Sequence, residues 1–163
     1  MSWFILTTIK RPYPRTVVLV VSLLVATAVV VLDRMTKLWA MARAPGDMEF
    51  IPGLFAITHH QNFGLIANLP VPRAIIIFVT SIVLFIVTYL CIRAIFRRNL
   101  IESTAFAIVI GGAIGNLWDR FSLGYVFDWM MFFNRSILNI ADVAIGVGIL
   151  ILLVVMRRQH NEA

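Results

Sequence analysis

Four long apolar runs limit what this chain can fold into. They cover residues 16–32, 74–92, 103–118 and 137–156. A helix needs about 20 mostly apolar residues to cross the hydrocarbon core of a bilayer, and each run is close to that length. The composition agrees, because 61% of the 163 residues are hydrophobic and 13% are charged, whereas a soluble domain has about 45–50% apolar and about 25% charged residues. The sequence therefore predicts four membrane-spanning helices.

The whole chain, residues 1–163, is predicted to form one integral membrane domain. The first long connection, residues 33–73, holds the turn signals Pro45-Gly46, Pro52-Gly53 and Pro70-x-Pro72. Between them, residues 50–58 mix aromatic and β-branched side chains, which is typical of short strands. We predict an all-α membrane protein with four transmembrane helices and a small external loop region that contains β-strands.

The charge distribution predicts the orientation. Four spans put both termini on one side, which carries eight basic residues and two acids, whereas the opposite side carries six basic residues and five acids. The positive-inside rule places the strongly basic side in the cytoplasm, so the connections at residues 33–73 and 119–136 are external. This topology explains the net charge of +6 better than nucleic-acid binding does. The eight basic residues are Lys10, Arg11, Arg15, Arg93, Arg97, Arg98, Arg157 and Arg158.

One carboxylate lies within an apolar run. Asp142 is about five residues inside the fourth predicted span, with Asn139 three positions before it on the same helical face. A carboxylate at the centre of a membrane helix costs roughly 2.5–3.5 kcal/mol on insertion scales, so such a residue is taken as functional by default. Asp142 is therefore the first candidate for a functional site.

Asp128 is the best candidate for a partner of Asp142. It lies in the short external connection, within the aromatic stretch of residues 125–133, and only 14 positions separate the two carboxylates. A close approach is geometrically easy, although Asp119 is available at the same edge of the membrane. Two carboxylates that share a site cannot both ionise easily, so one can act as a base while the other acts as an acid.

Other polar residues gather at the same external edge. Asn116, Asp119 and Arg120 share one helical face, and we expect Asp119 to be structural, in a local ion pair with Arg120. Asp33 and Lys37 are spaced for an interfacial salt bridge. The sequence has no His-Glu-x-x-His, Cys-x-x-Cys or Gly-x-Ser-x-Gly motif, so a metal site or a serine nucleophile is not expected.

Polar motifs follow one another over most of the chain. They are Asp33-x-x-x-Lys37, Gln61-Asn62-Phe-Gly64, Gly111-Gly-Ala-Ile-Gly-Asn-Leu-Trp-Asp-Arg120, Gly124-Tyr-Val-Phe-Asp128 and Leu138-Asn-Ile-Ala-Asp142. Together they resemble the bacterial lipoprotein signal peptidase family (signal peptidase II). The chain departs from the family pattern at residues 65–68, which read Leu-Ile-Ala-Asn.

The resemblance implies an aspartic endopeptidase of the bacterial cytoplasmic (inner) membrane, with its active site on the external face. It implies that the enzyme removes the signal peptide of prolipoproteins by cleaving before a diacylglyceryl-modified cysteine. No cofactor or metal is implied, the partners are this substrate and membrane lipid, and we expect a monomer. The implied catalytic residues are Asp128 and Asp142, the substrate-binding residues are Asn62, Asn116, Arg120 and Asn139, and the supporting residues are Asp119, Asp33, Lys37 and Gly64.

Two other classes of protein are alternatives for a chain with an intramembrane carboxylate. A small transporter subunit could use Asp142 as an ion or proton relay, but polar residues would then be spread through several spans. The first two predicted spans are almost purely apolar. A structural scaffold would gain nothing from the carboxylate. The clustering of polar residues at one edge favours chemistry on a membrane-borne substrate.

Overall fold

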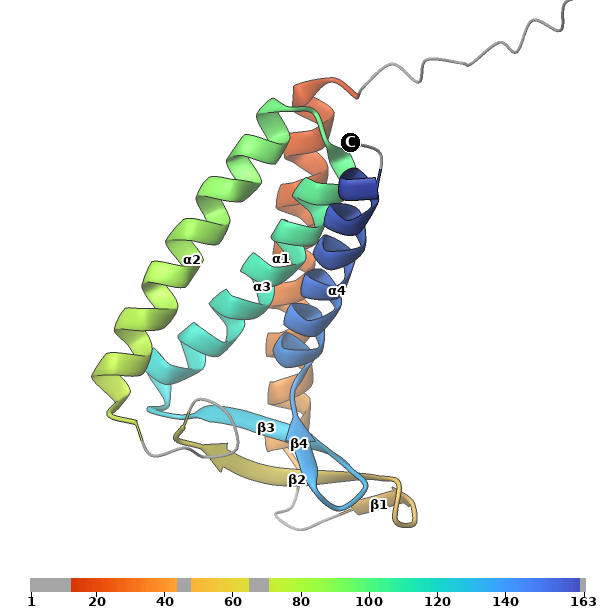
Figure 1. Ribbon diagram of the computed structural model, residues 1–163. Coiled ribbons are helices and arrows are strands. Elements are labelled where there is room, and N and C mark those ends of the chain that lie inside the picture. The colour runs from red at the N-terminus through yellow and green to blue at the C-terminus, as the bar shows by residue number, and fades with distance from the viewer. Residues whose placement is uncertain (1–12, 44–47, 65–70, 162–163) are drawn as a thin grey trace, which may run out of the picture.

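A computed structural model describes residues 13–43, 48–64 and 71–161, with side chains up to residue 158 (Figure 1). Residues 65–68, where the chain departs from the family pattern, lie outside the described residues. The helices are α1 (Arg15–Met41), α2 (Arg73–Phe96), α3 (Leu100–Ser122) and α4 (Ile140–Asn161). The strands are β1 (Met48–Ile51), β2 (Phe55–Asn62), β3 (Val126–Phe132) and β4 (Ser136–Leu138).

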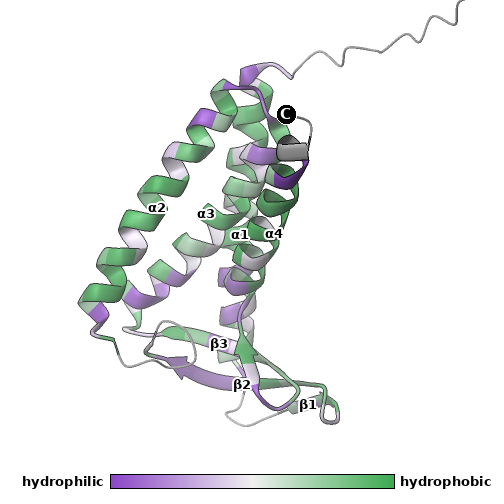
Figure 2. Cartoon of the chain, viewed as in Figure 1, coloured by the Kyte–Doolittle hydropathy of each residue, from purple (hydrophilic) through white to green (hydrophobic). Residues whose placement is uncertain are grey.

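All four helices are long and apolar enough to cross a membrane, which confirms the predicted spans. In the most apolar 18-residue segment of α3, half of the residues are buried, whereas 11–17% are buried in the corresponding segments of the other three helices. Apolar residues cover most of the helical surface, while hydrophilic residues gather at the two ends of the bundle (Figure 2). A surface of this kind is stable only where lipid replaces water. The helix α3 is therefore the centre of the bundle, and α1, α2 and α4 pack around it.

Glycines on α3 allow this close packing. A Cβ added to Gly111 would lie 2.7 Å from the carbonyl oxygen of Ala26 on α1, and one added to Gly112 would lie 2.5 Å from that of Ala141 on α4. Both distances are shorter than a carbon–oxygen contact allows. The backbones approach because these positions have no side chain, as in other small-residue helix contacts in membranes.

Two of the helix boundaries that differ from the prediction affect the site. The helix α1 continues past Leu32 to Met41, because Asp33 and Lys37 pair inside the protein rather than at the interface. The helix α4 begins at Ile140 rather than at residue 137. Asp142 consequently lies in the first turn of α4, not one to two turns inside the span.

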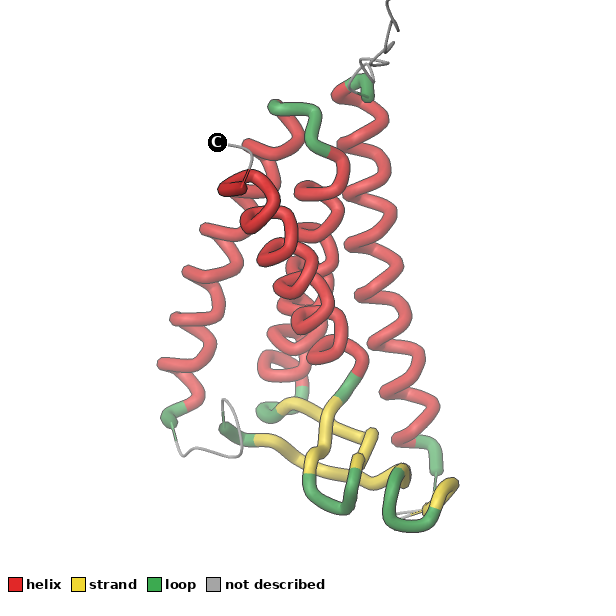
Figure 3. Tube along the Cα trace, turned by 45° about the vertical axis from the view of Figure 1, so that its right-hand side comes forward, coloured by secondary structure: helices red, strands yellow, loops and turns green. Residues whose placement is uncertain are grey.

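A four-stranded antiparallel sheet lies at the end of the bundle where α1 ends and α4 begins (Figure 3). Strands were predicted in the first connection, where β1 and β2 occur, but β3 and β4 were not. The sequence of β3 does not alternate between apolar and polar residues, since five successive residues from its start are buried and Asp128 is the one polar residue among them. In the β2–β3 register, His60 lies opposite Asp128. The sheet packs on the end of α1 through the cluster of Ala40, Ile57, Phe127, Trp129 and Met130.

Candidate active site

Asp128 and Asp142 come from different elements and meet where the sheet joins the bundle. Asp128 lies on β3 with 1% of its surface exposed, and Asp142 lies in the first turn of α4. Asn139 joins them, because its Nδ2 donates to Asp128 Oδ1 at 2.5 Å and its Oδ1 accepts the backbone N–H of Asp142 at 2.9 Å. One side chain thus contacts both predicted catalytic residues.

Asn139 and Asp142 also cap α4. The side chain of Asn139 accepts the N–H of Asp142, and Asp142 Oδ2 accepts the N–H of Asn139 at 3.3 Å. This reciprocal pattern is a capping box, and a carboxylate in the first turn further stabilises a helix through its dipole. The start of α4 and the placement of the Asp142 carboxylate are therefore one structural feature.

The side chains of Asn62 and Asn139 donate to the two oxygens of Asp128. Asn62 Nδ2 donates to Asp128 Oδ2 at 3.1 Å, while Asn62 Oδ1 accepts the N–H of Gly64 at 3.1 Å. A backbone N–H can only donate, so it determines which way an amide side chain faces. The N–H groups of Gly64 and Asp142 therefore fix both asparagines with their NH₂ groups toward Asp128.

Asn116 gives Asp142 the same kind of support from α3. Its Nδ2 donates to Asp142 Oδ1 at 2.8 Å. Its Oδ1 accepts two hydrogen bonds, from Asn139 Nδ2 at 3.1 Å and from Lys37 Nζ at 3.4 Å. The two donors on the oxygen fix the NH₂ group of Asn116 toward the Asp142 carboxylate.

The pKa of Asp128 lies well above the ordinary value for an aspartate. Burial of the carboxyl group is the largest cause, followed by the negative charge of Asp142, and the pKa is raised to about 6. Hydrogen bonds from Asn62 and Asn139 and the positive charge of Lys37 act in the opposite direction. A carboxyl group with a raised pKa can hold a proton near neutral pH, as a general acid must.

The predicted supporting residues form a buried ion network behind the two carboxylates. Lys37 Nζ lies 2.8 Å from Asp33 Oδ2 and 2.8 Å from Asp119 Oδ2. Arg34 Nη1 lies 2.9 Å from Asp119 Oδ1. The predicted pair of Asp33 with Lys37 exists, but its side chains are 2% and 0% exposed rather than interfacial.

Arg120 does not form the expected local ion pair with Asp119, whose charge is matched by Arg34 and Lys37. Its Nη2 instead donates to the carbonyl oxygen of Gly64 at 3.2 Å, and its Nη1 donates to that of Asn116 at 3.4 Å. The contact with Gly64 turns the guanidinium toward the sheet and into the wall of the cavity described next.

A cavity of about 620 Å³ opens beside the two carboxylates, between α2, α3 and α4. Its polar end holds Asn62, Asn116, Arg120 and Asp142, and the rest of its wall is mostly apolar. Its α4 wall runs from Asp142 to Leu152, which is about 15 Å at the helical rise of 1.5 Å per residue. The apolar wall residues include Val79, Val83, Val87, Phe106, Val109, Ile145, Ile149 and Leu152.

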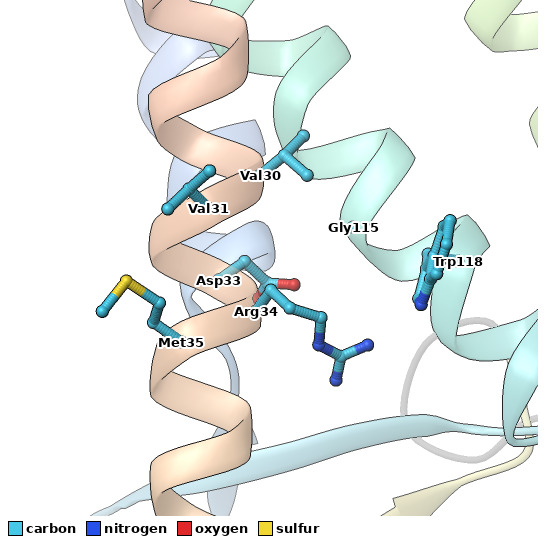
Figure 4. A pocket seen from close by; sticks show the side chains of 7 residues that line it. All are labelled: Val30, Val31, Asp33, Arg34, Met35, Gly115 and Trp118. Atoms are coloured by element: carbon cyan, nitrogen blue, oxygen red, sulfur yellow. The ribbon is translucent and has the colours of Figure 1, made fainter.

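A second, smaller cavity of about 290 Å³ lies between α1 and α3 (Figure 4). Asp33 and Arg34 extend from α1 toward α3 on this side, and Trp118 stands opposite them (Figure 4). Neither Asp128 nor Asp142 lines it. The larger cavity is therefore the one that adjoins the site, because it is lined by Asp142 and by Asn62, whose side chain bonds to Asp128.

Known proteins of similar sequence identify the family of this chain. Residues 25–158 match the model of a family described as signal peptidase (SPase) II. The chain belongs to the signal peptidase II family. Its membership makes it a peptidase and gives no support to the transporter alternative.

Similar proteins cover most of the chain. A lipoprotein signal peptidase of Enterococcus faecalis is 34% identical over 89% of this chain and 92% of its own length, and one of Gloeobacter violaceus is 34% identical over 85% and 83%. A solved bacterial membrane enzyme superposes with a TM-score of 0.77 at 26% identity, covering 86% of this chain and 90% of the other. A second bacterial membrane enzyme gives 0.71 at 28% identity.

Two residues near the carboxylates were missed by reasoning from the sequence. Arg34 pairs with Asp119. His60 lies opposite Asp128 in the pairing of β2 with β3. Contacts between distant segments place both residues, and no local signal reports such contacts. Among the described residues, no group of three or more His, Cys, Asp or Glu side chains could hold a metal ion.

Proposed function

We propose that this membrane peptidase removes signal peptides from prolipoproteins by cleaving before a diacylglyceryl-modified cysteine, with Asp128 and Asp142 as its catalytic residues. The observation that carries the proposal is that Asn139 bonds to both carboxyl groups, through its side chain to Asp128 and through its backbone N–H to Asp142, at the polar end of an apolar cavity. The similar proteins of Enterococcus faecalis and Gloeobacter violaceus are lipoprotein signal peptidases, which supports the substrate class.

The raised pKa of Asp128 favours this residue as the acid and Asp142 as the base. Ionised Asp142 takes a proton from a water molecule, whose oxygen attacks the scissile carbonyl carbon while Asp128 gives its proton to the carbonyl oxygen. When the carbon–nitrogen bond breaks, the nitrogen takes the proton held by Asp142, and the intermediate returns a proton to Asp128. The two carboxyl groups thus carry every proton transfer, and no cofactor takes part.

Arg120 is the substrate-binding residue that the geometry supports best. Asn62, Asn116 and Asn139 already donate to the two carboxylates, so we assign them chiefly to holding the catalytic residues. Arg120 lines the cavity and bonds only to backbone carbonyl oxygens among the described residues. Its guanidinium has further N–H groups for a substrate carbonyl.

The shape and polarity of the cavity suit a membrane-borne substrate. Its apolar wall includes Val79, Val83 and Ile149, which are exposed on the apolar surface of the bundle, and its polar end holds Asp142. The apolar part of a signal peptide, or the acyl chains on the modified cysteine, would contact this wall while the scissile bond lies at Asp128 and Asp142. Binding energy from such remote contacts positions the reacting bond.

Charge supports an external position for the catalytic residues. Described basic residues at the end of the bundle away from the sheet are Arg15, Arg93, Arg97, Arg98, Arg157 and Arg158. By the positive-inside rule this end faces the cytoplasm. The sheet and the carboxylates then lie at the external face of the bacterial cytoplasmic membrane, where we propose that one copy acts alone as a single domain.

The test uses one prolipoprotein in two forms, with and without the diacylglyceryl group on its cysteine, mixed with the purified enzyme in lipid vesicles. We expect the lipidated form to be cut immediately before the cysteine, at least about tenfold faster than its twin, because the acyl chains position the bond. Mass spectrometry of the products gives the cleavage position. Equal rates would reject the lipidated cysteine as the recognised feature, and failure to cut either form would reject the function.

A further inference from the structure

Lys37 is fully buried, and three acceptors surround its ammonium group. Nζ lies 2.8 Å from Asp33 Oδ2, 2.8 Å from Asp119 Oδ2 and 3.4 Å from Asn116 Oδ1. An ammonium has three N–H donors, so the three contacts use all of them. Burying a charge costs free energy even when all its donors have partners. The arrangement therefore points to a role beyond stability.

Both carboxylates next to Lys37 hold a backbone N–H beside a catalytic residue. Asp33 Oδ1 accepts the N–H of Ala141 at 3.0 Å, and Ala141 directly precedes Asp142. Asp119 Oδ2 accepts the N–H of Phe127 at 3.2 Å, and Phe127 directly precedes Asp128. One ammonium thus pairs with both carboxylates that anchor α4 and β3 at the site, and Arg34 supplies the second positive charge.

The third contact of Lys37 reaches the catalytic pair through an amide. By donating to Asn116 Oδ1, Lys37 helps to fix the Asn116 NH₂ group toward Asp142 Oδ1. Without this donor, the Asn116 oxygen would keep only the bond from Asn139 among the described residues, and a turn of the amide that brings this oxygen against the Asp142 carboxylate would be less strongly opposed. Two acceptors facing each other would repel.

We propose that Lys37 is the positioning residue of the catalytic pair: it holds the backbone beside Asp128 and Asp142 through Asp119 and Asp33, and it orients Asn116 toward Asp142. This inference rests on the proposed function. It gives Lys37 a role in positioning the catalytic residues and not in binding the substrate. Lysine suits the place because its compact ammonium points three donors in different directions, whereas the planar fork of arginine does not.

The charge of Lys37 also acts on Asp128. Burial and the charge of Asp142 raise the pKa of Asp128, and Lys37 opposes them. Arg120 on α3 also interacts with Asp128, and His60 on β2 lies opposite it. Removal of the Lys37 charge should therefore raise the pKa of Asp128 further, which moves the alkaline side of the pH–rate profile to higher pH.

The test compares Lys37→Met with the double variant Lys37→Met/Asp33→Asn. The single variant leaves a buried carboxylate without its counter-ion and could fail to fold. The double variant restores the charge balance and keeps an oxygen for the N–H of Ala141. We expect the double variant to fold, with kcat lowered about 100-fold, as for a misplacement of about 1 Å, with KM changed less than about threefold, and with its alkaline limit shifted upward.

The control is Arg97→Met, which removes an exposed ion pair with Glu102 at the other end of the bundle and should leave kcat unchanged. A folded double variant with the kcat and pH profile of the unmodified enzyme would overturn the positioning role. Asp142→Asn is measured in parallel. If that variant is inactive while the Lys37 variants are normal, only this inference fails; if it is active, the assignment of Asp142 as a catalytic residue in the proposed function fails.

Discussion

Replacing either catalytic carboxyl group by an amide, in Asp128→Asn or Asp142→Asn, is expected to lower kcat by at least about 10³-fold. General acid–base catalysis contributes roughly 10²–10⁴-fold, and each variant removes one of the two proton-transferring groups. An asparagine has nearly the same size and keeps one oxygen, so the bonds from Asn62 and Asn139 to residue 128 can largely persist. The measurement is cleavage of the lipidated precursor by purified variants in vesicles.

A matched control comes from a carboxylate far from the site. Glu102 lies in the first turn of α3, and its side chain is 15% exposed in an ion pair with Arg97. The variant Glu102→Gln makes the same chemical change and should cleave at the normal rate. Normal cleavage by both Asp128→Asn and Asp142→Asn, with all variants accumulating equally in the membrane, would show that the two carboxyl groups are not catalytic.

The second large effect is expected from Asn139→Ala. Asn139 is fully buried, and its side chain bonds to Asp128, to Asn116 and to the N–H of Asp142. The variant removes the cap of α4, which costs about 1 kcal/mol of stability. It also removes the donor to the Asp128 carboxyl group and the acceptor for the N–H of Asp142, so we expect kcat to fall about 100-fold or more. Thermal unfolding and kcat of the same preparation separate the two losses.

Two variants divide the loss of the cap from the loss of the amide donor. Asn139→Ser keeps an oxygen for the N–H of Asp142 but has no NH₂ for Asp128, so it should recover stability and little activity. Asn99 caps α3 by accepting the N–H of Glu102 at 3.1 Å, and Asn99→Ala should cost similar stability with normal kcat. Equal kcat for Asn139→Ala and Asn99→Ala would contradict the bridging role of Asn139.

The spans could be predicted from the sequence because bilayer thickness sets their length directly. The depth of Asp142 could not. Asn139 and Asp142 have the spacing of a capping box, but Ile137 and Leu138 precede them and extend the apolar run. In the structure these two apolar residues belong to β4. The start of a helix is thus hidden where a strand of similar composition joins it.

Sequence motifs identify the residues of the site, whereas contacts between distant segments determine its geometry. The motifs that resemble the family pointed to Asp128 and Asp142, and the structure brings both to Asn139. The buried state of Asp33 and Lys37 could not be predicted, because their partners lie far along the chain. Asp33 bonds to Ala141, which is 108 positions away. The spacing of four residues predicts that Asp33 and Lys37 pair within α1. It does not predict which other elements bury the pair.

The dependence of kcat/KM on pH, measured on the lipidated precursor, tests the catalytic pair most directly, because it reports the protonation of the free enzyme. In the proposed mechanism, Asp128 must be protonated and Asp142 ionised before the substrate reacts. Since burial and the charge of Asp142 raise the pKa of Asp128 to about 6, kcat/KM should fall as pH rises through about 6, because Asp128 then loses the proton that it must give. A rate that rises from low pH to a plateau and stays there through neutral pH would require no protonated carboxyl group and would contradict the pair.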